Sequence, residues 1–158
     1  MYEGDDIEPR IERGTINLSN LNYVHNGWLI ENWLEVKGFH IMYGAPNTGK
    51  TFLALDLAIN MCSSNEIWFG KRVYGGEKIF YLALEGGSQI RQRLFAIQQE
   101  KPDISDEVFG KRRYLLTVSS AAINFSSEKE TKAFAMYLRR GGYTFLIIDA
   151  LTLAIQGA

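Results

Sequence analysis

The chain has 158 residues, enough for one domain with a sizeable core. Apolar residues make up 46% and charged residues 22%, as in an ordinary globular protein, and the net charge of -1 excludes a general polyanion binder. The single cysteine, Cys62, excludes an intrachain disulfide and favours a reducing compartment, so we expect a cytoplasmic location. No apolar run has the length of a membrane span, so we expect no membrane partner, and the acidic N-terminus does not fit a signal peptide.

The beginning of the chain differs in composition from the rest. We expect a polar N-terminal lead-in at residues 1–27 and one α/β domain at residues 28–158. Aromatic and polar residues alternate over Asn17–Gly38, which predicts packing on the domain edge, with one helical turn near Ile30–Leu34. The alternative is that the tryptophans of this stretch cover the adenine base of a nucleotide.

A glycine-rich stretch lies between two apolar segments. The first segment, Phe39–Tyr43, predicts a buried parallel strand, and the second, Lys50–Cys62, predicts a buried helix. This strand–loop–helix context separates the stretch from an ordinary glycine-rich turn. The stretch reads G-x-x-x-x-G-K-[ST], the phosphate-binding P-loop motif, and consists of Gly44, Ala45, Pro46, Asn47, Thr48, Gly49, Lys50 and Thr51.

The residue types of this loop suit a phosphorylated ligand. Gly44 and Gly49 let the backbone turn tightly and approach an anion, so that successive N–H groups form an anion-binding nest. The positive end of the following helix adds to the attraction. We expect Lys50 to reach the β- and γ-phosphates of ATP and the Thr51 hydroxyl to ligate Mg²⁺.

Strands and helices alternate over the rest of the chain, which predicts a parallel sheet with helices on both faces. Ser88 is a candidate N-cap, and Ser127 and Glu130 have the spacing of a capping box. The predicted elements are a loop at Asn65–Glu77, a strand at Lys78–Leu84, a helix from Ser88 to about Glu100, a strand at Arg113–Val118, a helix from Ser127 to Arg140 and a strand at Thr144–Ile148.

Two acidic residues follow predicted strands. Asp149 follows four apolar residues, which is the Walker B pattern, and it could position the Mg²⁺ held by Thr51. The next residue, Ala150, is not the glutamate that many ATPases use to activate water. Glu85 closes another apolar strand and could orient a water in line with the γ-phosphate. Its alternative is a solvated glutamate at a strand end.

Several basic residues are open to two interpretations. Arg91 and Arg93 could reach a phosphate or a neighbouring subunit, or could form a solvated helix face. The clusters Lys71-Arg72 and Lys111-Arg112-Arg113 could contact nucleic acid, although most such clusters are simply solvated. No metal-ligand partners stand at useful spacing from the two histidines.

The combination of the P-loop, the strand ending in Glu85 and the Walker B strand without a following glutamate resembles the RecA-like ATPases. Within that superfamily the chain is most similar to the hexameric plasmid and phage replicative helicases, a group described as AAA-like. This similarity rests on Trp33-Leu34 before the P-loop strand, Trp68-Phe69-Gly70 after the first helix and Leu84–Gly87 before an arginine-containing helix. It implies Lys50 and Glu85 as catalytic residues.

The resemblance implies an ATP-hydrolysing, Mg²⁺-dependent domain of a DNA-dependent motor, assembled as a homo-hexamer. In RecA-like domains a further strand follows the Walker B strand and lies between it and the P-loop strand. Because the sequence stops at Ala158, we expect a domain truncated after the Walker B strand. The alternatives are a recombinase or assembly switch that does not translocate, and a nucleotide-binding module without turnover; a small-molecule kinase fits less well.

Overall fold

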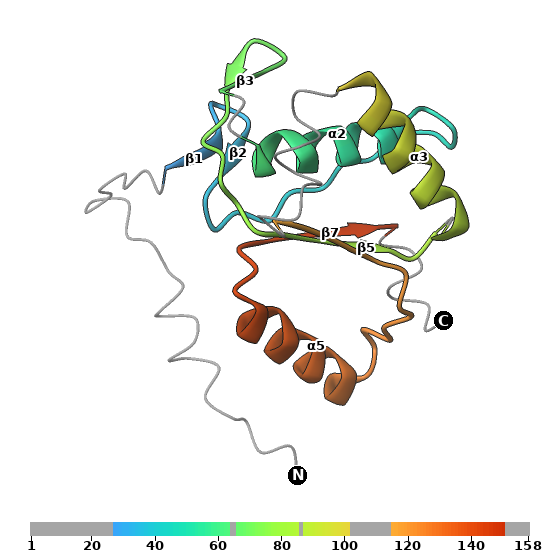
Figure 1. Ribbon diagram of the computed structural model, residues 1–158. Coiled ribbons are helices and arrows are strands. Elements are labelled where there is room, and N and C mark those ends of the chain that lie inside the picture. The colour runs from blue at the N-terminus through green and yellow to red at the C-terminus, as the bar shows by residue number, and fades with distance from the viewer. Residues whose placement is uncertain (1–26, 64–65, 86, 102–114, 151–158) are drawn as a thin grey trace, which may run out of the picture.

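A three-stranded parallel sheet forms the centre of the protein. The computed structural model describes residues 27–63, 66–85, 87–101 and 115–150. Strand β5 (Ile79–Ala83) lies between β6 (Leu116–Ser119) and β7 (Phe145–Asp149) and pairs with both in parallel. Helices α2 and α3 cover one face of the sheet and α5 covers the other (Figure 1). The predicted α/β class, with a parallel sheet and helices on both faces, is therefore confirmed.

Strand β5 is buried over its whole length. Because side chains alternate along a strand, its residues belong to two separate apolar clusters. Ile79, Tyr81 and Ala83 pack in the cluster that contains α2 and Ile90 of α3. Phe80 and Leu82 instead pack with Phe134 of α5. A continuous apolar run is what a strand covered on both faces requires.

Helix α2 has the predicted bounds, Lys50–Cys62. It is buried from Leu57 to Cys62, whereas Phe52 in its first turn is 50% exposed. The prediction of a buried helix therefore holds beyond the first turn. Among the described residues no helix combines the length and the apolar character that crossing a bilayer would require.

The other two helices differ slightly from their predicted bounds. Helix α3 spans Gly87–Glu100, so Ser88 lies within its first turn and the prediction of Ser88 as N-cap was wrong. Helix α5 spans Glu128–Gly141 and begins as predicted, because the Ser127 hydroxyl accepts a hydrogen bond from the backbone N–H of Glu130. The Glu130 side chain completes the cap differently, since it accepts from the N–H of Asn124.

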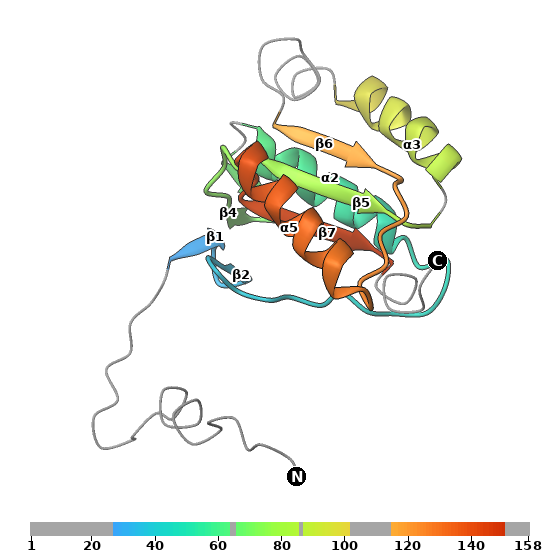
Figure 2. The same cartoon turned by 90° about the horizontal axis from the view of Figure 1, so that it is seen from below.

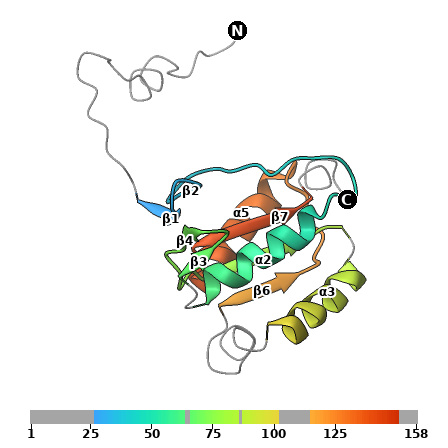
Figure 3. The same cartoon turned by 90° about the horizontal axis from the view of Figure 1, so that it is seen from above.

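The segment before the glycine-rich loop is not a strand. Residues 39–43 are extended but pair with no strand among the described residues, and Phe39 and Tyr43 are 82% and 89% exposed. The prediction of a buried strand at Phe39–Tyr43 was therefore wrong for this structure. A strand needs a hydrogen-bonded neighbour, and the segment runs along the β7 side of the sheet, away from β6 (Figures 2 and 3). Residues 151–158 lie outside the described residues, so the predicted truncation stays a prediction.

Two short hairpins replace segments that were predicted differently. Strands β1 (Trp28–Ile30) and β2 (Leu34–Glu35) pair where a helical turn was predicted. Strands β3 (Ile67–Trp68) and β4 (Lys71–Arg72) pair within the predicted loop. Asn32 and Phe69 make the two turns possible by adopting left-handed φ angles of 59° and 47°. Both hairpins depend on pairing over very few residues, which hydrophobic periodicity does not report.

Asp56 fixes helix α2 to its neighbours. Its Oδ2 atom accepts a hydrogen bond of 2.7 Å from the indole N–H of Trp68, on β3. Its Oδ1 atom accepts a hydrogen bond from the ammonium group of Lys101, directly after α3. The partly buried carboxylate thus joins α2 to β3 and to the end of α3, and it holds the helix that begins at the glycine-rich loop.

Candidate functional site

The glycine-rich loop wraps around its own lysine. The ammonium group of Lys50 donates hydrogen bonds of 3.0 Å to the carbonyl of Gly44 and 2.7 Å to the carbonyl of Ala45. The Thr48 hydroxyl donates to the same Ala45 carbonyl at 2.9 Å. The lysine therefore lies over the concave side of the loop, the position from which it could transfer its hydrogen bonds to a phosphate.

Backbone conformation explains two of the loop's residues. Gly49 has a φ of 85°, a left-handed conformation that favours glycine, and Asn47 has a φ of 61°. A Cβ at Gly44 would lie 3.4 Å from the Thr48 hydroxyl, so a side chain there would press on the loop from within. The glycines thus allow the tight course that the motif predicted.

The N-terminus of α2 is open to an anion. No side chain caps it, and its first turn contains no acidic residue. Its first backbone bond runs from the N–H of Leu53 to the carbonyl of Gly49, at 3.0 Å. The N–H groups and the positive dipole end of this helix are therefore not offset by a carboxylate of the same turn.

The two acidic residues predicted from separate strands lie side by side. Ala83 of β5 pairs with Asp149 of β7, and the Asp149 carbonyl accepts hydrogen bonds from Leu84 at 2.7 Å and Glu85 at 3.2 Å. The backbone of Glu85 is therefore bound directly to the backbone of Asp149. Glu85 is exposed and Asp149 is partly buried. The carboxyl ends of β5 and β7 thus bring together the predicted base and the predicted metal ligand.

Tyr81 is a residue of this region that sequence reasoning did not single out. Its side chain is fully buried, and its hydroxyl donates a hydrogen bond of 2.7 Å to Oδ2 of Asp149. Burial raises the pKa of the Tyr81 hydroxyl, the hydrogen bond to Asp149 and its charge raise it further, and Arg93 lowers it. The available signal was the one hydroxyl-bearing side chain in an otherwise apolar strand, since a buried hydroxyl needs a partner.

The structure separates the two arginines of α3. Arg91 is exposed, whereas the guanidinium of Arg93 lies 5.1 Å from the ring centre of Phe52 and donates to Gln89 at 3.3 Å. Phe52 belongs to the first turn of α2, next to Thr51. Arg93 is therefore the arginine that packs against the beginning of the helix after the glycine-rich loop.

The loop and the acidic residues lie at the same end of the molecule. In all three views the carboxyl ends of β5 and β7 point toward the end where α2 begins and α3 begins (Figures 1, 2 and 3). The carboxyl edge of a parallel sheet is where α/β proteins bind ligands. The sequence-predicted residues therefore converge on one edge of the sheet.

These residues fit a nucleotide with a divalent cation. The loop offers an ammonium group and an uncapped helix N-terminus for phosphates, and Thr51 and Asp149 offer oxygen donors for Mg²⁺. Among the described residues no group of three or more His, Cys, Asp or Glu side chains could hold a metal ion. Mg²⁺ in nucleotide sites is bound by one or two protein oxygens together with phosphates and water, so a larger cluster is not required.

Together, the parallel sheet, the lysine-containing loop before α2 and the acids at the sheet edge are consistent with a P-loop nucleotide-binding domain. The family described as AAA domain matches residues 23–158. The chain therefore belongs to the AAA domain family and carries a nucleotide-binding ATPase module. Neither the curated proteins nor the solved structures contain a match to the chain.

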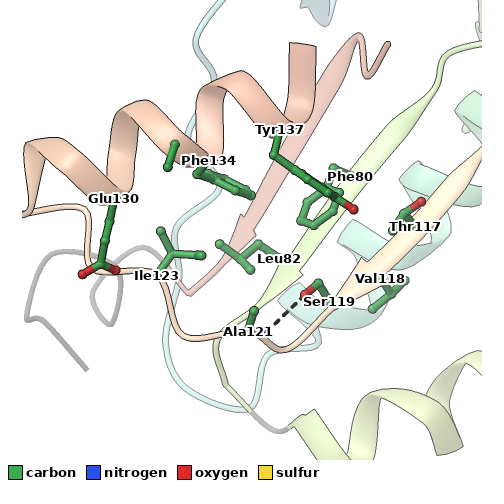
Figure 4. A pocket seen from close by; sticks show the side chains of 11 residues that line it. Phe80, Leu82, Thr117, Val118, Ser119, Ala121, Ile123, Glu130, Phe134 and Tyr137 are labelled. Atoms are coloured by element: carbon green, nitrogen blue, oxygen red, sulfur yellow. Dashed lines mark hydrogen bonds between the residues drawn. The ribbon is translucent and has the colours of Figure 1, made fainter. Parts of the chain in front are cut away.

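A separate hollow lies on the opposite face of the sheet. It has a volume of about 490 Å³ and lies between α5 and the strands β5 and β6 (Figure 4). Three of its polar side chains already have partners, since Thr117 bonds to Tyr143 at 2.8 Å, Ser119 accepts from Ala121 at 3.2 Å and Glu130 accepts from Asn124 at 3.0 Å. Because Phe80 and Leu82 of its lining point away from α2, this hollow is distinct from the candidate site at the carboxyl edge of the sheet.

The remaining predicted contacts are not tested by the structure. Lys71 and Arg72 form strand β4, and a nucleic-acid role for them stays a prediction, while residues 111–113 lie outside the described residues. His40 lies 3.4 Å from the carbonyl of Glu35, and His25 is outside the described residues. Trp33 is 49% exposed and contacts Trp68 edge to face, so the adenine-covering alternative also stays open.

Proposed function

We propose that this chain binds ATP with Mg²⁺ at residues 44–51 and hydrolyses the bond between the β- and γ-phosphates. The observation that carries the proposal is the backbone hydrogen bond from Glu85 to Asp149. It holds a candidate base beside a candidate metal ligand, at the sheet edge next to the glycine-rich loop. A phosphate-binding loop alone would support only nucleotide binding.

The phosphate-binding residues act by charge and position. Lys50 exchanges its hydrogen bonds to Gly44 and Ala45 for bonds to the β- and γ-phosphates, and the N–H groups at the start of α2 bind the same oxygens. Thr51 and Asp149 would hold Mg²⁺, which when bound would offset the negative charge on the phosphates. These groups stabilise the charge that develops as the terminal phosphoryl group is transferred.

Glu85 is the proposed general base. Its exposed carboxylate orients a water in line with the γ-phosphate and accepts a proton from it as the water oxygen bonds to phosphorus. The bond to the β-phosphate oxygen breaks, and ADP and inorganic phosphate leave. Ala150 cannot perform this role, because a methyl group neither accepts a proton nor orients water.

The finer proposal is a RecA-like arrangement within a DNA-dependent motor of the replicative helicase type, assembled as a homo-hexamer. Its support is the sequence resemblance described above, together with residues 39–43, which run on the β7 side of the sheet. A further strand beside β7 would pair with both, as in RecA-like domains. Unwinding of duplex DNA by the complete native protein would support the motor, and filament formation without unwinding would favour a recombinase or assembly switch.

The test of the proposed function is substitution of Lys50. Lys50→Ala removes the ammonium group from the loop, and we expect ATP affinity and hydrolysis to fall by about 100-fold or more. The matched control is Lys132→Ala, because Lys132 is a 73% exposed lysine on α5, on the opposite face of the sheet. Equilibrium binding of ATP and phosphate release are measured for both variants. Wild-type hydrolysis by Lys50→Ala would show that the assignment is wrong.

A further inference from the structure

Tyr81 occupies an unusual place for a polar side chain. It lies in the middle of the central strand, is fully buried and packs in the apolar cluster between the sheet and α2. A phenol hydroxyl in such a place needs a hydrogen-bond partner, because an unsatisfied buried hydroxyl is destabilising. The partner is Oδ2 of Asp149, 2.7 Å away and 68 residues along the chain.

The register of the sheet explains how the two groups meet. Tyr81 pairs with Ile147, and Ala83 pairs with Asp149, so Asp149 lies two residues farther along than Tyr81 on the neighbouring strand. Tyr81 and Ile147 belong to the same apolar cluster, and the alternation of side chains places Asp149 on that face too. A diagonal neighbour at this offset is within reach of an aromatic side chain.

The hydrogen bond restricts the Asp149 carboxylate. Among the described residues, Tyr81 makes the one hydrogen bond that the Asp149 side chain receives, and Oδ1 accepts none. A hydrogen bond to an ionised carboxylate is shorter and stronger than a neutral one, so it limits rotation of the carboxylate plane. Because Tyr81 is held by packing on all sides, its hydroxyl is a fixed reference point for Oδ2.

We propose that Tyr81 is a positioning residue that orients Asp149 so that its other oxygen, Oδ1, is available to Mg²⁺ bound with the nucleotide. The inference rests on the proposed function, and Tyr81 itself touches neither metal nor phosphate. Partners that orient a metal-ligating carboxylate contribute about 10–100-fold to metal affinity. If the hydrogen bond to Asp149 served only to satisfy the buried Tyr81 hydroxyl, its loss would lower stability and leave metal affinity unchanged.

The experiment compares two tyrosines of the same sheet region. Tyr81→Phe removes the hydroxyl from Asp149, and Tyr143→Phe removes a hydroxyl bonded to Thr117 at 2.8 Å in the cluster on the α5 face. Mn²⁺ serves as the probe, and its binding to the protein–ADP complex is followed by electron paramagnetic resonance. ADP affinity is also measured in EDTA, and folding of each variant is checked by a thermal melt.

The expected result is a 10–100-fold weaker Mn²⁺ affinity for Tyr81→Phe, with ADP affinity in EDTA changed less than about twofold. Tyr143→Phe should match the wild type in both measurements. Unchanged Mn²⁺ affinity in Tyr81→Phe overturns the inference and leaves the proposed function intact. A wild-type chain that binds neither ADP nor Mn²⁺–ADP overturns the proposed function, and the inference with it.

A second pair of variants isolates the path through Asp149. Asp149→Asn is compared with the double variant Tyr81→Phe/Asp149→Asn. The double variant has no charged carboxylate at position 149 that loss of the Tyr81 hydroxyl could leave unpaired, so it remains testable if Tyr81→Phe alone fails to fold. If Tyr81 acts through Asp149, the second substitution changes the residual Mn²⁺ affinity by less than about twofold. A further tenfold loss in the double variant would show that Tyr81 acts by another route and would overturn the inference.

Discussion

The two halves of the candidate site are held in place in different ways. Glu85 and Asp149 stand at the ends of strands that are hydrogen-bonded along their whole length, and β5 is fully buried. The glycine-rich loop follows a segment, residues 39–43, that is exposed and unpaired among the described residues. The loop is held mainly by hydrogen bonds from its own Lys50 and Thr48.

This difference indicates how the site responds to a ligand. The sheet edge already has the geometry that positions Glu85 and Asp149, since their backbones are bound to each other. In the proposed function the loop exchanges its internal hydrogen bonds for bonds to phosphate, because Lys50 binds the Gly44 and Ala45 carbonyls in this structure. We therefore expect substitutions in the sheet to act mainly on stability or chemistry, and substitutions in the loop to act mainly on nucleotide affinity.

The largest effect is expected for Glu85→Gln. Loss of the carboxylate removes the proton acceptor, so ATP turnover should fall by about 100- to 10,000-fold. ATP affinity should change less than about threefold, because the backbone bond to Asp149 is kept. Steady-state phosphate release and equilibrium binding measure the two effects. Glu128→Gln, at an 81% exposed position on α5, is the matched control, and wild-type turnover in Glu85→Gln would remove Glu85 from the mechanism.

A substitution in the core and a substitution in the segment before the loop should differ strongly in their effect on the free energy of unfolding. Leu82→Ala opens a cavity at a fully buried position of β5 and should lower the free energy of unfolding by about 2–5 kcal/mol. Ile41→Ala, at a 62% exposed position before the loop, should change it by less than about 0.5 kcal/mol. Urea denaturation of the chain measures both values. Equal losses would mean that residues 39–43 pack in solution as a core strand does.

Two glycines with similar backbone angles allow the loop to be tested separately. Gly49 has a φ of 85° and Gly70, between β3 and β4, has a φ of 72°, and a Cβ at either would meet no atom within 4 Å. Alanine at either position should cost about 1–2 kcal/mol of stability. Gly49→Ala alone should weaken ATP binding, by about tenfold, because the loop relaxes from its binding conformation. Equal ATP affinity in the two variants, measured by equilibrium binding, would contradict this role of Gly49.

The smallest effect concerns Cys62, at the buried end of α2. Burial raises the pKa of its thiol to about 12, and the charge of Glu77 adds to this, while a hydrogen bond with the Ile79 backbone lowers it. The unfolded thiol ionises near pH 9, so the unfolded state binds fewer protons between pH 9 and 12, and stability falls as pH rises. The loss should be about 1.4 kcal/mol per pH unit above the unfolded value.

Cys62→Ala should remove this loss of stability at alkaline pH. Urea denaturation at pH 8, 9 and 10 measures the free energy of unfolding, and the pH-independent loss caused by the smaller alanine side chain is subtracted. The thiol should also react slowly with a thiol reagent in the native protein at pH 8. Rapid labelling under native conditions would show that the end of α2 opens readily. The apolar cluster that Cys62 shares with β5 would then be less tightly packed than the burial of β5 indicates.

Local patterns in the sequence determined the parts of this protein that depend on near neighbours. The glycine and lysine spacing predicted the loop, apolar content predicted α2 with its observed bounds, and the Ser127–Glu130 spacing predicted the cap of α5. The acidic residues after β5 and β7 were also visible, since each follows a continuous apolar run. Each of these features is set by residues within a few positions of one another.

Only the tertiary structure decided which strands are neighbours. The pairing of Ala83 with Asp149 places Glu85 beside Asp149, and the same register brings Tyr81 to Asp149 across 68 residues of sequence. Within the part of the chain that the structure describes, it also left residues 39–43 unpaired, although their apolar pattern equals that of a buried strand. Hydrophobic periodicity reports which face of an element is buried, whereas strand pairing depends on backbone groups that are the same in every residue. The sequence therefore determined the chemical groups of the site, and the packing of the sheet determined which of them meet.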